Sequence, residues 1–256
     1  MAAAGWGHAG QDAQPNAVEP QRLLEAMRTY AEQYVANLPN FLCDQVTRQY
    51  EAGRELKKWH KGDTLTFRLL FSQGQEQRHL ELVNEKPLHV GMHRWRTPLS
   101  TEGEFGILLA NIFATASEAT FTWRGWQDVR GRRAAVFDYS IDQAHSTLKL
   151  SLGDLATAVA PYFGSVYADP ETGAIWRIED AANNLPKQID TKSIATIIDY
   201  GDVTIGAKRY LLPVDASITL STDANHIRNE LEFRNYRKFE TDSVIKYASS
   251  DGGDAR

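Results

Sequence analysis

Cys43 is the only cysteine of the chain and the side chain with the most direct nucleophilic chemistry. A catalytic thiol needs a neighbouring base, usually a histidine, and spacing along the sequence does not reveal one. A single cysteine also excludes an intramolecular disulfide and a zinc site built on cysteines. We therefore predict that Cys43 is a buried thiol without a chemical role.

Histidines are the next candidates for chemistry, because His89 and His93 are four residues apart and follow His60 and His79. On a helix this spacing could hold a metal ion. The glutamate of an HExxH motif is missing, and glycine and proline in Pro87–Pro98 predict a loop instead of a helix. The sequence therefore predicts no metal site.

Basic and aromatic residues alternate in Phe121–Phe137, where Trp123 and Trp126 are followed by several arginines. Such a pattern can stack on and neutralise single-stranded nucleic acid. The residues Val129–Arg132 instead indicate a hairpin turn, at which charges are solvated. Because the net charge of the chain is −5, we predict no nucleic-acid partner.

Known catalytic motifs are missing from the sequence. It contains no glycine-rich phosphate loop, no GxSxG elbow and no closely spaced set of metal ligands. Asp169 and Glu171 are acidic, but we assign them to a turn. The sequence predicts no catalytic residue and no cofactor. A hydrolase assembled from scattered residues remains an alternative.

The composition is that of a folded globular protein, with 42% hydrophobic and 24% charged residues among 256. The most apolar stretch, Ile107–Ala116, is too short to cross a bilayer. Residues 1–17 lack the charged and apolar regions of a signal peptide, and we expect a flexible tail there. A second flexible tail is expected at residues 248–256.

A hairpin in the middle of the chain is the clearest element. Ser165–Asp169 and Ala174–Glu179 flank a turn in which Pro170 fixes its own φ angle and Gly173 can adopt a positive φ. Alternation of apolar and polar residues predicts further strands. These are Phe41–Glu51, Asp63–Phe71, Arg78–Val83, Ala135–Ile141, Leu148–Leu152, Ile194–Tyr200, Val203–Ile205, Lys208–Leu220 and His226–Phe239.

Breaks in this pattern predict the connections. Gly201 and Gly206 are expected to lie in turns, and Pro213 at an edge or a bulge. Pro161 and Gly164 favour a covering loop over Leu155–Gly164, although a short helix is the alternative.

Two helices complete the prediction. Pro20–Leu38 has an apolar stripe and a polar face of mixed charge, which favours docking on a sheet over lying on a membrane. Ser100–Ala116 begins with a capping-box pattern, Thr101 and Glu104, and is unusually apolar. This second helix is either a plug that completes the core or a lid over an apolar pocket.

This order of elements resembles the LolA/LolB/LppX superfamily of periplasmic lipoprotein and lipid carriers, including RseB-type relatives. The segments that carry the resemblance are Pro20–Leu38, TLTFRLLF with RHLELV, Glu102–Ala116 and SVYADPETGAIWRI. The resemblance implies a mainly β (α+β) fold, a curved antiparallel sheet or half-open β-barrel covered by two main helices. The resemblance spans most of residues 20–240, and we expect residues 18–247 to form a single domain. The chain is longer than a typical LolA, with extra strands after Ile194, and is also similar to exported bacterial proteins without a known activity.

The resemblance implies a non-enzymatic periplasmic or secreted protein that binds a lipid or lipoprotein acyl chain on the concave apolar face. The alternative is a cell-envelope scaffold domain with a filled core and a protein partner; the oligomeric state is left open. The candidate lining residues are Phe67, Leu69, Phe71, Leu80, Leu82, Phe105, Leu108, Leu109, Ile112 and Phe113.

Overall fold

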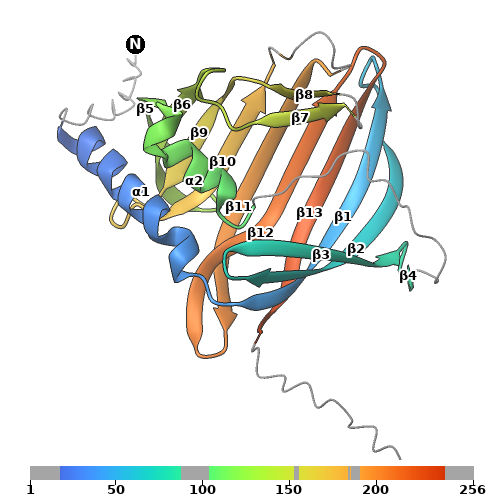
Figure 1. Cartoon of the computed structure of the whole chain (residues 1–256), viewed down its shortest axis with the longest axis horizontal. Coiled ribbons are helices and arrows are strands. Elements are labelled where there is room, and N and C mark those ends of the chain that lie inside the picture. Colours follow the sequence, from blue (N-terminus) through green and yellow to red (C-terminus); the bar gives the residue numbers. More distant parts are fainter. Residues whose placement is uncertain (1–17, 88–103, 153–155, 184, 186–190, 240–256) are drawn as a thin grey trace, which may run out of the picture.

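The computed structural model describes residues 18–87, 104–152, 156–183, 185 and 191–239. These residues form a mainly β fold, in which a large curved sheet carries two helices on its concave side (Figure 1). The predicted fold class is therefore confirmed. The division into a domain at residues 18–247 and two flexible tails stays a prediction, because both tails lie outside the described residues.

Eleven strands make up the large sheet, in the order β4-β3-β2-β1-β13-β12-β11-β10-β9-β6-β5, and every neighbouring pair is antiparallel. Among the described residues the edge strands β4 and β5 do not pair, so the sheet is open. Its strands are β1 (Phe41–Gly53), β2 (His60–Ser72), β3 (Gln75–Val83), β4 (Lys86–Pro87), β5 (Thr120–Val129), β6 (Arg132–Ile141), β9 (Tyr162–Ala168), β10 (Ile175–Ala182), β11 (Ser193–Ile205), β12 (Lys208–Ser221) and β13 (Asn225–Lys238). A separate hairpin joins β7 (Lys149–Leu152) to β8 (Ala156–Val159).

Helix α1 (Val18–Asn37) buries one stripe of apolar side chains, Leu23, Met27, Ala31 and Tyr34. The turn of the central hairpin supports its first half. Gly173 has φ +72°, and a Cβ atom there would lie only 2.4 Å from the carbonyl carbon of Ala26. The helix thus rests directly on a turn that requires glycine. The expectation that this helix docks on the sheet is confirmed.

Helix α2 (Ile107–Phe113) is much shorter than the predicted Ser100–Ala116. Residues up to 103 lie outside the described residues, and Glu104–Gly106 form a turn. Gly106 directly precedes the helix. Its φ angle of +116° is not helical, so the helix cannot begin earlier in the chain as predicted. A single 3₁₀ turn, η1 (Thr115–Ser117), follows the helix.

Two other predictions are wrong, one for Gly201 and one for the segment Leu155–Gly164. Gly201 lies inside the continuous strand β11, where a Cβ atom would be 2.9 Å from Val214 Cγ1 of β12, so the glycine makes room for a neighbour. The predicted covering loop Leu155–Gly164 is replaced by β8 and the start of β9. Pro213 does lie at a register shift, as predicted.

No helix in the described part of the chain is long and apolar enough to span a membrane.

Candidate functional site on the concave face

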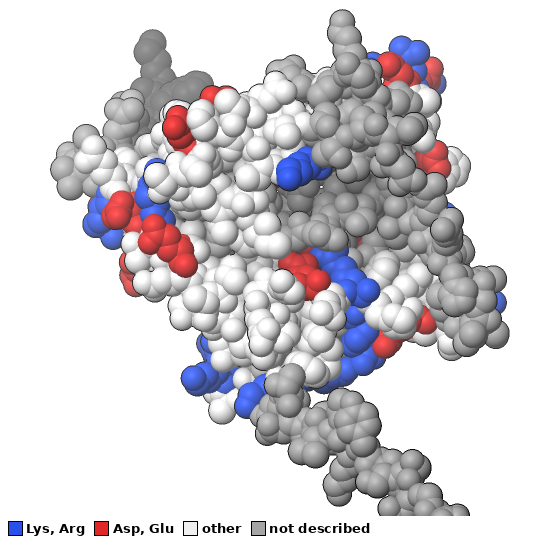
Figure 2. Space-filling model, viewed as in Figure 1, with Lys and Arg blue, Asp and Glu red and all other residues white. Residues whose placement is uncertain are grey.

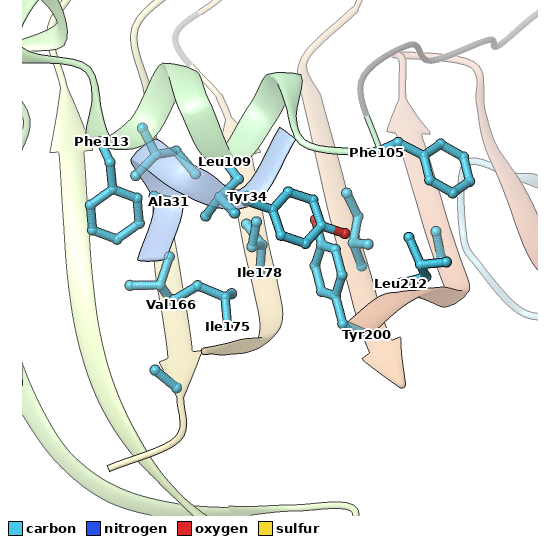
Figure 3. Packing of buried hydrophobic residues seen from close by; sticks show 14 of the residues in the cluster. Ala31, Tyr34, Phe105, Leu109, Phe113, Val166, Ile175, Ile178, Tyr200 and Leu212 are labelled. Atoms are coloured by element: carbon cyan, nitrogen blue, oxygen red, sulfur yellow. The ribbon is translucent and has the colours of Figure 1, made fainter. Parts of the chain in front are cut away.

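The part of the concave face beneath the helices is filled with side chains. Phe105, Leu109, Ile112 and Phe113 are all buried in the main hydrophobic core. Figure 3 shows Leu109 above Ile178 of the sheet, with Tyr34 of α1 beside Tyr200 of β11. The ring centroid of Phe105 lies 5.3 Å from those of Phe41 and Phe233. This half of the face is a packed core.

The ten predicted lining residues fall into two groups. Leu69, Phe71, Phe105, Leu109, Ile112 and Phe113 are buried, whereas Phe67, Leu80, Leu82 and Leu108 are only partly buried. A register shift in β2 and β3 separates two of them, because Leu80 pairs with Phe67 but Leu82 pairs with Thr66. Paired residues share a face of a sheet, so Leu82 does not continue the row of Leu80.

A buried ion cluster ties the turn before α2 to strand β3. Arg78 donates hydrogen bonds to Glu76 and Glu104, at 2.7 and 2.6 Å. Burial raises the pKa of Glu76, and the negative charge of Glu104 adds to this. Tyr200 also donates to the carbonyl oxygen of Glu104, at 3.1 Å. Glu104, predicted to start the helix, instead fixes the segment that leads into it.

Polar side chains cross the concave face in a line that the sequence analysis did not find. The register pairs Gln49 of β1 with Asn229 of β13, and Asn229 with Ile218 of β12. The line continues from Ile218 to Thr196 of β11, and from Thr196 to Asp180 of β10. We call Gln49, Asn229, Thr196 and Asp180 the polar stripe.

Rows of apolar side chains lie on both sides of this stripe. One row is buried and faces the helices: Leu231, Ala216, Ile198, Ile178, Val166 and Phe137. The other row lies on the same face, on the far side of the polar stripe, and consists of Ile227, Leu220, Ile194 and Ala182, of which the first three are only partly buried. We call this second row the outer row. The concave face is therefore apolar, polar and apolar again along β13, β11 and β10, whereas Ile218 keeps β12 apolar throughout.

Asp180 is the ionisable member of the polar stripe. Tyr139 donates a hydrogen bond to its Oδ1 atom, at 2.6 Å. Burial raises the pKa of Asp180 to about 6, and the Tyr139 hydrogen bond partly opposes this shift. The same burial raises the pKa of Tyr139. A carboxylate in this position is costly to ionise.

A groove of about 280 Å³ runs between α1 and α2, at the lower end of the range for small-molecule sites. Small side chains, Ala31, Ala110 and Ala114, form much of its wall. Figure 2 shows charged side chains gathered over α1, while the surface over α2 is largely uncharged. Ile107 of α2 is 46% exposed on this surface.

The residues singled out for other chemistry occupy ordinary structural positions. Cys43 is buried, and burial raises the pKa of its thiol to about 12, as expected for an inert cysteine. His60 and His79 are exposed on separate strands, and His89 and His93 lie outside the described residues. Over the described residues, no group of three or more His, Cys, Asp or Glu side chains is arranged to hold a metal ion.

Two of the predicted hairpin turns keep the roles assigned to them. Asp169 accepts hydrogen bonds from the backbone N–H groups of Glu171 and Thr172. In the hairpin of β5 and β6, Arg130 and Gly131 have φ angles of +53° and +76° and form the turn. Arg130 forms an ion pair with Asp215. These polar groups are satisfied by the protein itself.

No protein-family model and no curated protein matches the sequence. Solved structures that are similar to the chain include a DUF1329 family protein from Desulfovibrio piger, with 7% identity, a TM-score of 0.39 and coverage of 85% of this chain and 92% of that one. A LolA superfamily protein from Nitrosomonas europaea has 8% identity, a TM-score of 0.33 and coverage of 86% and 93%. An outer membrane lipoprotein-sorting protein domain from Vibrio parahaemolyticus has 9% identity, a TM-score of 0.38 and coverage of 88% and 94%. LolA-like proteins are thus among the solved structures to which the chain is similar, and no residue role is transferred from these structures.

Proposed function

We propose that the protein is a non-enzymatic, exported carrier that binds the acyl chain of a lipid or lipoprotein on the concave face of its sheet. The observation that carries this proposal is that the strands of the sheet are much longer than helix α2, which lies over them. β12 and β13 have 14 residues each, whereas α2 has 7. The strands are therefore about 47 Å long and α2 about 10 Å.

The two helices leave part of the apolar face without a helix above it. In Figure 1, α1 and α2 lie in front of the strands from β5 to β11. No described helix lies in front of β1 and β13, but the β7–β8 hairpin crosses in front of the upper part of the sheet. In the outer row, Ile194, Leu220 and Ile227 remain only partly buried. Partly buried apolar side chains on a concave surface are what an acyl chain requires.

The predicted lining residues then take two roles in this proposal. The partly buried Phe67, Leu80 and Leu108 contact the acyl chain, together with the outer row. The buried Leu69 and Phe71, with the apolar residues of α2, form the floor and wall that hold the sheet in its curved shape.

Fluorescent acyl-chain binding tests the proposal with two variants of a single strand. Ile194→Gln places a polar side chain in the outer row, whereas Ile197→Gln changes an exposed isoleucine on the convex face of β11. We expect Ile194→Gln to weaken binding about tenfold or more and Ile197→Gln to leave it unchanged. Lack of acyl binding to the wild-type protein, with no apolar ligand in native mass spectra of protein from its natural host, would contradict the proposal.

The scaffold alternative is favoured by a different observation. The helix-covered half is a packed core, and Phe163 and Ile197 are 42% and 37% exposed on the opposite, convex face. If an envelope protein binds there, its crosslink to this protein should be lost in the Ile197→Gln variant and retained in the Ile194→Gln variant. The same two variants therefore give opposite results for the two functions.

Export is part of the proposal and has its own test. Expression of the natural gene in its host, followed by fractionation of the cells, is expected to place the protein in the periplasm or the medium. Recovery with the cytoplasmic enzymes would contradict export while leaving acyl binding to be judged separately.

A further inference from the structure

The turn between β1 and β2 gathers positive charge on a chain that is acidic as a whole. Residues 53–61, which we call the basic tip, contain one acidic side chain, Glu55, and four basic ones, Arg54, Lys57, Lys58 and Lys61. All four basic side chains are exposed. Lys57 pairs with Glu55, whereas Lys58 and Lys61 form no ion pair or hydrogen bond with any described residue. The tip therefore presents unpaired cations to solvent.

The basic turn between β5 and β6 provides a contrast within the same sheet. Arg130 of that turn pairs with Asp215. The guanidinium carbon of Arg132 lies 4.4 Å from the ring centroid of Trp176. These arginines stabilise the fold through their contacts, and Lys58 makes no such contact. Stability of the fold thus does not account for the charge of the basic tip.

Leu56 lies in the basic tip in a conformation that a leucine rarely adopts. Its φ angle is +52°, and its N–H group donates a hydrogen bond to the carbonyl oxygen of Gly53, at 2.9 Å. Glycine or asparagine occupies this left-handed region at a lower cost. The Leu56 side chain is 49% exposed, so burial within the protein offsets little of that cost. An exposed apolar side chain on a strained backbone indicates a contact outside the molecule.

The base of the tip is fixed to the neighbouring strand β13. The guanidinium group of Arg228 lies over the rings of Trp59 and Tyr50, at 4.5 and 5.1 Å. Asn225, which follows the β12–β13 turn, donates a hydrogen bond to Glu51, at 2.8 Å. The two turns therefore lie together at one end of the sheet (Figure 1). Because its base is anchored, the tip is held in place before a partner arrives.

Acidic proteins and anionic lipid surfaces both combine negative charge with an apolar contact. Lysine is depleted in protein interfaces. At a bilayer, by contrast, each lysine near anionic headgroups adds attraction, and an apolar side chain can enter the boundary between headgroups and acyl chains. Three of the four cations in the tip are lysines, which favours the bilayer. A cavity of about 280 Å³, lined by residues 53–58 and His60, offers space for a phosphate group among them.

We propose that the basic tip docks the protein on a membrane surface that contains anionic phospholipids. Leu56 enters the headgroup region, and the four cations contact the phosphates around it. The tip lies beyond the end of the sheet and includes no residue of the buried row or the outer row. The proposal therefore concerns a second surface and does not depend on acyl binding.

Co-sedimentation with vesicles tests the docking of the wild-type protein. The probes are vesicles of phosphatidylcholine alone and vesicles of equal parts of phosphatidylcholine and phosphatidylglycerol. At low ionic strength we expect at least about tenfold tighter binding to the anionic vesicles. About 1 M salt should abolish this preference, because it shortens the screening length to about 3 Å. Equal binding to both kinds of vesicle, or binding to neither, would overturn the proposal.

A pair of charge variants assigns the binding to the tip. Lys58→Gln combined with Lys61→Gln removes two cations without breaking an ion pair, and should weaken binding to anionic vesicles about tenfold or more. Lys208→Gln combined with Arg209→Gln is the control. It makes the same change in net charge at the exposed β11–β12 turn, at the opposite end of the strands, and should leave binding within about twofold. Equal losses in both variants would overturn the proposal.

Leu56→Asn separates membrane contact from a structural role. Asparagine tolerates the positive φ angle, so the thermal midpoint should stay the same or rise. Loss of the apolar side chain should still weaken vesicle binding about fivefold. Ile107→Asn, which changes a 46% exposed side chain of α2, should leave vesicle binding unchanged. A lower midpoint with unchanged vesicle binding in Leu56→Asn would show a structural role and overturn the proposal.

The outer-row variant Ile194→Gln keeps this proposal distinct from the proposed function. It should retain vesicle binding whatever happens to acyl binding. Vesicle binding that is lost in Ile194→Gln but kept in the tip variants would place the contact on the concave face and overturn docking through the tip. Crosslinking of the tip to an acidic protein, without binding to anionic vesicles, would also overturn it.

Discussion

At the scale of single residues, Gly173 joins the central hairpin to helix α1. We predict that Gly173→Ala lowers the free energy of unfolding by about 2–4 kcal/mol, since alanine disfavours a positive φ angle and its methyl group would overlap Ala26. Gly131→Ala is the matched control. Gly131 has φ +76°, but a Cβ atom there would meet no atom within 4 Å. Urea denaturation should show a loss of only about 1–2 kcal/mol for this control, and equal losses would count against the docking role of Gly173.

Asp180 makes the stability of the protein depend on pH. Its pKa is raised from 3.8 to about 6, so the folded state holds a proton that the unfolded state has lost in this range. The stabilising contribution is complete below about pH 4 and is lost as the pH rises through about 6, which corresponds to about 3 kcal/mol. Asp180→Asn cannot ionise and still accepts the Tyr139 hydrogen bond.

We therefore expect Asp180→Asn to be more stable than the wild-type protein at about pH 7.5, and to lose this advantage near pH 4. Denaturation curves at both pH values measure the effect. Asp142→Asn provides a contrast, because a hydrogen bond with His145 lowers the pKa of the exposed Asp142 and the sign of the effect reverses. Parallel pH profiles for wild-type protein and Asp180→Asn would contradict the prediction.

At the scale of elements, the ion cluster fixes α2 to β3. Arg78→Met would remove the cation that pairs with Glu76 and Glu104 in this cluster, and we expect the free energy of unfolding to fall by about 3–5 kcal/mol. Hydrogen exchange in α2 should accelerate at the same time, because the segment that leads into the helix is released. The control Arg48→Met removes a more exposed ion pair with Glu232 and should cost less than about 1 kcal/mol. Similar losses for both variants, with unchanged exchange in α2, would refute this role.

At the scale of the whole molecule, strands β1 and β13 pair in the interior of the sheet although they are far apart in the sequence. We therefore predict one cooperative unfolding transition, as a single domain requires. Leu231→Ala of β13, whose side chain is 5% exposed, should lower the unfolding free energy by about 2–5 kcal/mol. Circular dichroism and tryptophan fluorescence should report the same midpoint. Two separate midpoints would indicate that the halves of the sheet unfold independently.

Local chemistry within the sequence determined the strands, the first helix and the tight turns. Alternation in Asp63–Phe71 predicts which side chains share a face, because successive side chains of a strand point in opposite directions. Asp169, Pro170 and Gly173 predict their turn because the conformational preferences of these residues are intrinsic. These features need no information from distant parts of the chain.

Only the tertiary structure decided the features that depend on distant neighbours. Glu104 has the sequence signature of a helix start, but the cation of Arg78 on β3 holds it in a buried cluster instead. Gly201 resembles a turn residue until the side chain of Val214 occupies the space beside it. The polar stripe combines residues of four strands that the sequence does not place together. Its alignment follows from strand order and register, which pair residues as far apart as Gln49 and Asn229 and are set by the folded sheet as a whole.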